Sequence, residues 1–161
     1  MPDLTTLLVS VLNGVAIGVL LFMMAVGLSL IFGLMDVLNL AHGAVFLIGS
    51  YLAAELAGGA GGGFLVAAGV AVAGGLVIGG GLGLSLRPLR GRGHLDQVLL
   101  TLGIAFVLTG AAATLWGDDF RSVPAPAALA GGGEVFGQAY PTYRLAVIVI
   151  GLAIAAAVYV V

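Results

Sequence analysis

The chain has 161 residues, of which 61% are hydrophobic and 7% are charged, and its formal net charge is −2. A soluble domain carries about 25% charged residues, so this sequence, with a mean hydropathy of +1.26, has too little charge to cover a water-facing surface. The small net charge gives no reason to expect a nucleic-acid partner. The absence of cysteine excludes disulfides and thiolate metal sites. Together these properties predict an all-α, polytopic membrane protein.

The first apolar segment covers residues 7–32 and is long enough to cross a membrane. Asp3 is the only early charge, whereas a cleavable signal begins with positive residues and has a shorter apolar core. We therefore expect this helix to stay in the protein. Gly14 and Gly18 have a spacing that lets a second helix approach closely.

A polar stretch follows and places an acid, an amide and an imidazole in otherwise apolar sequence. These are Asp36, Asn39 and His42, with Gly33 before them and Gly43 after them. An Asp at the centre of a membrane helix costs roughly 2.5–3.5 kcal/mol, and non-helical backbone at that depth must be buried in protein or line a water-filled cavity. We interpret the stretch as a break between two half-helices. The first ends near Gly33 or the next residue, and the second begins near Asn39, whose side chain can cap it.

Such a break can belong to a substrate site, or it can simply connect two helices. The N-terminus of a helix carries about half a positive charge and can bind a carboxylate, and transporters place broken helices at their substrate sites. The alternative is a plain loop at the membrane surface, with Asp36 and Asn39 as turn and cap residues and His42 bonded to a neighbouring carbonyl. We expect no metal site, because His42 and His94 lie far apart on different segments.

The next two apolar segments are residues 44–56, which are short for a full crossing, and residues 65–86. A glycine-rich turn separates them. In the second segment Gly75, Gly79 and Gly83 recur every four residues, so they share one stripe of a helix. We interpret this stripe as a close helix contact. A pore lined by bare backbone is the alternative.

The only basic cluster of the chain lies between residues 87 and 94, and the chain has no lysine. Its arginines are Arg87, Arg90 and Arg92. The positive-inside rule makes this short loop cytoplasmic. Residues 97–116 then return outward, and residues 117–143 form an external loop in which prolines and glycines interrupt regular structure. The N-terminus is external and the polar break lies toward the cytoplasmic half.

The last apolar segment, residues 145–161, follows Arg144 and has no polar flank after it. The sequence thus predicts about five transmembrane helices, the second of them short or broken. We expect the chain to be the front part of a longer membrane protein.

Common enzyme motifs are absent. The sequence contains no Gly-x-Ser-x-Gly and no His-Glu-x-x-His, and without lysine it cannot contain the phosphate-binding Gly-x-x-x-x-Gly-Lys-Ser/Thr. We therefore expect no catalytic residue and no cofactor bound by this chain. If ATP drives the protein, another subunit binds the nucleotide.

Several short motifs follow one another along the chain. They are Leu12-Asn13-Gly14, the run from Gly27 to Met35, Asn39-Leu40-Ala41-His42-Gly43, Gly49-Ser50-Tyr51, and Arg87-Pro88-Leu89-Arg90 followed by a helix with Thr101 and Gly103. In this order they resemble the permease subunits of branched-chain amino-acid ABC importers over essentially the whole chain. The resemblance implies an inner-membrane permease that pairs with a second permease, two cytoplasmic ATPases and an external solute-binding protein.

Two departures from the family pattern bear on function. Leu40 stands where many relatives carry an aromatic residue, and Ala44 where many carry a polar or acidic one, which leaves the exact solute open. The family's ATPase-coupling segment follows the span in which this sequence ends at Val161. The chain is therefore expected to lack the main docking surface for the ATPase.

The sequence predicts a permease subunit of an ATP-driven importer, which translocates branched-chain or other hydrophobic amino acids delivered by a solute-binding protein. The residues assigned to the substrate pathway and helix break are Asn39, His42, Gly43 and Asp36. Three alternatives remain. They are a permease for another small polar solute such as urea or an amide, an ion-coupled secondary transporter or channel with Asp36 and His42 as a proton relay, and a structural membrane subunit.

Overall fold

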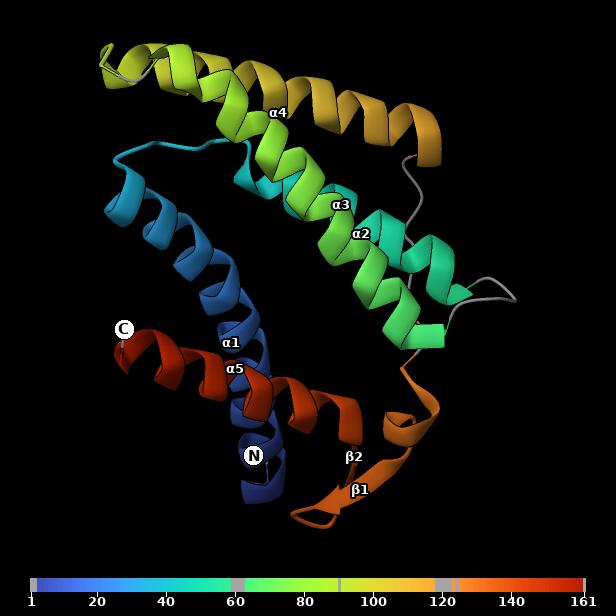
Figure 1. The fold of residues 1–161 in the computed structure, drawn as a ribbon. Coiled ribbons are helices and arrows are strands. Elements are labelled where there is room, and N and C mark those ends of the chain that lie inside the picture. The colour runs from blue at the N-terminus through green and yellow to red at the C-terminus, as the bar shows by residue number, and fades with distance from the viewer. Residues whose placement is uncertain (1–2, 59–62, 90, 118–122, 124, 161) are drawn as a thin grey trace. The chain divides into compact units, whose positions relative to one another are not determined.

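Figure 1 shows the fold in a computed structural model, which describes residues 3–58, 63–89, 91–117, 123 and 125–160. Within these ranges the chain forms the α-helices α1 (Leu4–Met35), α2 (His42–Gly58), α3 (Gly63–Leu86), α4 (His94–Trp116) and α5 (Thr142–Val160). Four of them, α1, α3, α4 and α5, are long and apolar enough to cross a membrane, whereas α2 has 17 residues and is shorter. The all-α, polytopic architecture predicted from the sequence is confirmed.

The helices extend beyond the apolar segments that predict them. The first begins at Leu4 and ends at Met35 rather than at residues 7 and 32, and α4 begins at His94 rather than at residue 97. Hydropathy marks where the chain is apolar, but a helix ends where its backbone hydrogen bonding stops. Polar residues are therefore included in the end turns, as with Asp96 in the first turn of α4, where its negative charge favours the helix N-terminus.

The chain packs as two compact units. One contains residues 28–124, with the end of α1 followed by α2, α3 and α4; the other contains residues 1–27 and 125–161, with the start of α1, a hairpin and α5. The division falls inside α1. Each unit has its own helix contacts, and each holds part of the polar chemistry of the chain.

In the unit of residues 28–124, α2 and α3 pack closely along small residues. A Cβ atom added at Gly74 would lie 2.7 Å from Leu52 Cδ1, and one at Gly49 would lie 3.8 Å from the Ala71 carbonyl oxygen. The rings of Tyr51 on α2 and Trp116 at the end of α4 stack with centroids 5.2 Å apart and an interplanar angle of 11°. This unit therefore forms a three-helix group held by close backbone approach on one side and an aromatic pair on the other.

The other unit contains the only strands in the described part of the chain. They are β1 (Gly132–Val135) and β2 (Gln138–Pro141), which pair antiparallel with Val135 opposite Gln138. The two residues between them, Phe136 and Gly137, have φ angles of 54° and 76°, which is the left-handed geometry of a type I′ hairpin turn. Residues 117–143, which were expected to form a loop interrupted by prolines and glycines, contain this hairpin and the short 3₁₀ helix Ala127–Leu129.

The same unit packs α5 on the first part of α1. A Cβ added at Gly151 would overlap the Val19 side chain, and Gly151 and Ile148 are the buried residues of α5. This is a second close helix contact that a missing side chain permits.

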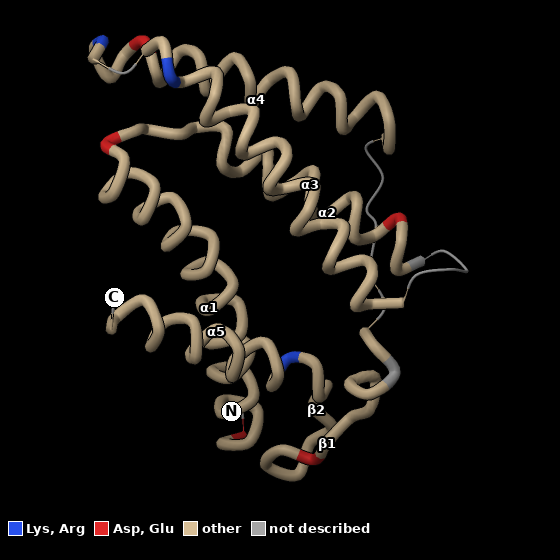
Figure 2. The backbone as a smooth tube through the Cα atoms, viewed as in Figure 1, with Lys and Arg blue, Asp and Glu red and all other residues tan. Residues whose placement is uncertain are grey.

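Most of the helix surface remains uncovered by the chain itself. Between 6% and 11% of the most apolar window of each candidate span is buried, and Figure 2 shows the charged residues confined to helix ends and connections. Exposed apolar surface of this extent is stable only against lipid or against further protein.

Candidate functional site

The predicted helix break occupies residues 36–41, between α1 and α2. The first helix ends with the Asp36 N–H donating to the Phe32 carbonyl oxygen at 2.9 Å, and Asp36 itself has a φ of 53°. Asp is one of the few residues that tolerate this left-handed conformation, which commonly ends a helix. The helix was expected to end near Gly33 or Leu34, and it ends at Met35, so that Gly33 lies within it and Asp36 makes the reversal.

The Asn39 side chain organises the start of α2. Its Oδ1 accepts a hydrogen bond from the Ala41 N–H at 3.0 Å, and its carbonyl oxygen accepts one from the His42 N–H at 3.3 Å. A side chain that accepts from the N–H two residues ahead forms an Asx turn, which here leads directly into α2. Asn39 is buried and Ala41 is completely buried, so the amide acts inside the protein rather than at a solvated loop.

Thr101 of α4 holds the break from the opposite side. Its hydroxyl lies 3.2 Å from the Leu40 N–H and 3.2 Å from the Leu38 carbonyl oxygen, and it is also within 2.9 Å of the Gln97 carbonyl oxygen. Thr101 is fully buried. One neutral hydroxyl thus satisfies backbone groups that the break removes from helical pairing, as buried polar backbone requires.

Apolar residues close the break on its remaining side. Val37 and Ala41 form a buried cluster with Leu82 and Leu86 from the end of α3. The break thus packs Val37 and Ala41 against the end of α3, while Asp36, Leu38 and Leu40 remain exposed.

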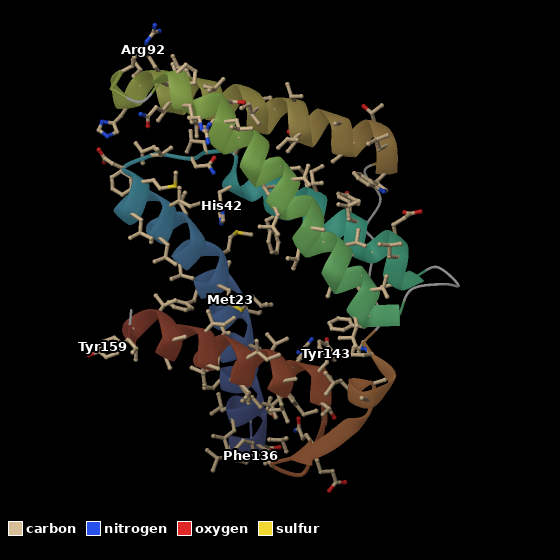
Figure 3. All side chains as sticks on the ribbon, in the orientation of Figure 1. Met23, His42, Arg92, Phe136, Tyr143 and Tyr159 are labelled. Carbon is tan, nitrogen blue, oxygen red and sulfur yellow. The ribbon has the colours of Figure 1, made fainter. Side chains whose placement is uncertain are left out.

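His42, the first residue of α2, lines a cavity of about 400 Å³. The position of this side chain is labelled in Figure 3. The other lining residues come from α2 and α3: Val45, Phe46, Gly49, Ser50, Ala53, Ala71, Val72 and Gly75. The cavity is mainly apolar, with the imidazole of His42 and the hydroxyl of Ser50 as its polar side chains. Gly43 lies beside His42 in the first turn, and a Cβ added there would meet nothing within 4 Å.

Asp36 lines a different cavity from His42. Its Oδ2 lies 3.2 Å from Nε2 of His94 at the start of α4, and both side chains are mostly exposed. Together with Arg92 and Gln97 they line an open hollow of about 510 Å³, and Figure 3 labels Arg92 at this end of the unit. Asp36 therefore faces the basic turn, whereas His42 faces the apolar cavity between α2 and α3.

The other residues singled out from the sequence are dispersed. Arg87 opens the 3₁₀ turn Arg87–Leu89 and is exposed, while Arg90 lies outside the described residues. Beside Gly75, Gly79 and Gly83 a Cβ would meet nothing within 4 Å. The close approach of α2 to α3 uses other glycines, so packing along this stripe stays a prediction.

Sequence reasoning missed one polar cluster, which lies in the other unit. The Arg144 guanidinium in the first turn of α5 donates from Nη1 to Asn13 Oδ1 of α1 at 2.6 Å and from Nε to the Tyr143 hydroxyl at 3.2 Å. It also lies 5.9 Å from the centroid of the Tyr143 ring. The sequence offered one signal for this cluster, which is a lone arginine just before an apolar span. It did not indicate the partner, because Asn13 lies 131 residues away.

No group of three or more His, Asp or Glu side chains that could hold a metal ion occurs in the described ranges. Within the part of the chain that the structure describes, the main polar features are the break, the His42 cavity, the Asp36–His94 hollow and the Arg144 cluster.

Comparison with known proteins places these features in a family context. The chain matches a family described as "Branched-chain amino acid transport system / permease component" over residues 10–161. It is also similar to the high-affinity branched-chain amino acid transport system permease protein BraD of Pseudomonas aeruginosa, with 36% identity over 53 residues. That similarity covers 33% of this chain and 17% of the length of BraD. No solved structure shows significant similarity to the chain.

Proposed function

Because the chain belongs to the family of branched-chain amino-acid transport permease components, we propose that it forms part of the membrane pathway of an ATP-driven importer. Its solutes are branched-chain and other hydrophobic amino acids. The family match over residues 10–161 is the observation that carries this proposal. The chain is a transport subunit and not an enzyme, binds no cofactor, and leaves ATP hydrolysis to a separate subunit.

The proposed assembly contains a second permease subunit, cytoplasmic ATPase subunits and an external solute-binding protein. It sits in a bacterial inner membrane with the Arg87–His94 loop in the cytoplasm and the N-terminus outside. The positive-inside rule supports this orientation, because Arg87 and Arg92 lie in the short connection between α3 and α4.

The substrate pathway is proposed to pass the His42 cavity. Its volume of about 400 Å³ falls in the range of about 300–1,000 Å³ typical of small-molecule sites. Apolar walls from α2 and α3 suit an aliphatic side chain, and the first turn of α2, with His42 and Gly43, offers a partial positive charge to a carboxylate. No fixed ion is needed for a zwitterion in such a site.

The break itself is proposed to act as a hinge support rather than as a ligand. Asn39 and Thr101 already bond the backbone of the break, so their polar groups are occupied. Movement of α2 would carry His42 with it, while Asp36 at the other end of the break remains paired with His94. ATP-driven rocking of the helices would then change access to the cavity.

The test is ATP-driven leucine uptake by the full-length protein, assembled with its partner subunits in proteoliposomes. We expect His42→Ala to lower uptake by roughly twofold to tenfold, the effect of one lost hydrogen bond. Asn39→Ala should lower both uptake and stability, because the Asn39 side chain bonds the backbone just before α2. Ser85→Ala serves as the control, since Ser85 is exposed and bonds only its own helix at Gly81.

Unchanged uptake in His42→Ala at equal expression would remove the cavity from the pathway. Uptake that needs a membrane potential and no ATP would overturn the importer proposal in favour of an ion-coupled transporter.

A further inference from the structure

The Arg144 cluster is built around a positive charge that lacks a counter-ion. Arg144 is the only basic residue in the unit formed by residues 1–27 and 125–161. Among the described residues no carboxylate lies within salt-bridge distance of it; the one ion pair found there joins His94 to Asp36. Arg144 lies in the first turn of α5, so the partial positive charge of the helix N-terminus adds to the charge of its guanidinium. The local potential is therefore strongly favourable to an anion.

The cluster also has unused hydrogen-bonding capacity. A guanidinium has five N–H groups, and those of Arg144 have two partners, Asn13 Oδ1 and the Tyr143 hydroxyl. The remaining N–H groups of the guanidinium are available to a ligand.

A cavity opens beside these groups. It has a volume of about 220 Å³ and is lined by Asn13, Ala16, Ile17, Leu20, Tyr143, Arg144 and Val147. One end is polar, and the rest is an aliphatic wall formed mainly by the α1 residues. Figure 3 labels Tyr143 at the polar end, where α5 begins. The volume is small for a drug-sized ligand and suits a compact molecule with one charged end and one aliphatic end.

We propose that this cavity binds the carboxylate of an aliphatic α-amino acid on Arg144, with its side chain along the α1 wall. The inference rests on the proposed import function and adds to it a substrate site on the outer side of the permease, separate from the His42 cavity.

The site offers a charged donor and an amide acceptor side by side, and this combination suits a zwitterion. The guanidinium donates to a carboxylate, while Asn13 Oδ1 keeps a second lone pair that can accept from an ammonium group. A lipid phosphate would meet the same guanidinium but would be repelled by the amide oxygen. A free amino acid therefore matches the site better than an anionic lipid headgroup.

The experiment measures equilibrium binding of radiolabelled leucine to the full-length permease complex in nanodiscs of neutral phosphatidylcholine, without added solute-binding protein. We expect saturable binding that weakens by roughly tenfold or more in Arg144→Gln, because a charge-assisted bond is lost. Leucinamide, which lacks the carboxylate, should bind the unaltered protein roughly tenfold more weakly than leucine. Glu134→Gln removes a charge from exposed β1 of the same unit and should bind leucine normally.

A second variant protects the test against misfolding of Arg144→Gln. Ile17→Trp keeps the charge and fills the cavity from an exposed position on α1, so it should also weaken leucine binding. Equal binding of leucine and leucinamide would overturn the proposal, as would normal leucine binding by both variants. If Arg144→Gln changes only the retention of phosphatidylglycerol in mixed nanodiscs, the site belongs to lipid and the proposal also fails.

ATP-driven leucine uptake by the same preparations separates this inference from the function on which it rests. If the unaltered complex takes up leucine normally and the Arg144→Gln variant binds leucine as tightly as the unaltered protein, only the outer site is refuted. Absence of leucine uptake by the unaltered complex refutes the proposed function.

Discussion

Two of the long-range polar contacts among the described residues differ in how many of their hydrogen-bonding groups are paired. At the break, the neutral hydroxyl of Thr101 is fully buried and bonds the backbone at Leu38 and Leu40. In the other unit, the charged Arg144 is half-buried and reaches Asn13 with donors to spare. A satisfied neutral contact fixes structure at low electrostatic cost. A charge with unused donors can still bind an anionic group.

The largest effect is expected where the satisfied contact is broken. Thr101→Val keeps the side-chain shape and leaves the Leu40 N–H without its partner, which should destabilise the full-length protein by about 1–3 kcal/mol. Unfolding by denaturant in detergent micelles measures this loss. Thr109→Val is the matched control, because Thr109 is exposed on the same helix and bonds only its own backbone; its change should stay within about 0.5 kcal/mol. Equal losses in both variants would show that the break does not depend on Thr101.

A somewhat smaller effect tests what holds α5 on α1. Gly151→Ala introduces a Cβ that overlaps Val19, and we expect a destabilisation of about 1–2 kcal/mol from overpacking. In Gly79→Ala the new Cβ meets open space, so stability in detergent should hold or rise by up to about 1 kcal/mol. If Gly151→Ala is neutral, the helix contact depends on the Arg144 bond rather than on packing, and the contrast between the two polar contacts disappears.

The smallest effect is expected at the exposed ion pair. Asp36→Asn removes the charge that faces His94, but both side chains are mostly exposed, and such pairs contribute little. The free energy of unfolding, measured through the thermal midpoint, should change by no more than about 0.5 kcal/mol. The left-handed conformation at residue 36 should be retained, because Asn also tolerates it. A larger loss would place the pair with Thr101 among the contacts that fix the break.

Hydropathy predicted the number and order of the helices, because a membrane span must be long and apolar whatever it packs against. The local bond of the Asn39 side chain was also predictable, since it reaches only two positions along the chain. The helix ends were less so: the first helix was expected to end near Gly33 or Leu34, whereas it ends at Met35 and Asp36 adopts the positive φ. A carboxylate that can enter the left-handed region was an available but weaker signal than glycine.

Long-range partners were beyond sequence reasoning. The hydroxyl of Thr101 meets a backbone group 61 residues away, and Arg144 meets Asn13 131 residues away. Neither pairing leaves a periodic pattern in the chain. The hairpin at Phe136 and Gly137 was missed for a different reason, because a bulky residue at positive φ is disfavoured and is not read as a turn signal.

The division of α1 between two compact units has a consequence for synthesis. Residues 28–124 are contiguous and can pack as soon as α4 has left the ribosome, but the first part of α1 packs on α5. At about 5–20 residues per second, the 131 residues between Asn13 and Arg144 take on the order of ten seconds to translate. The N-terminal part of α1 can therefore make its contact with Arg144 only after α5 has been synthesised, although it is the first part of the chain to be made.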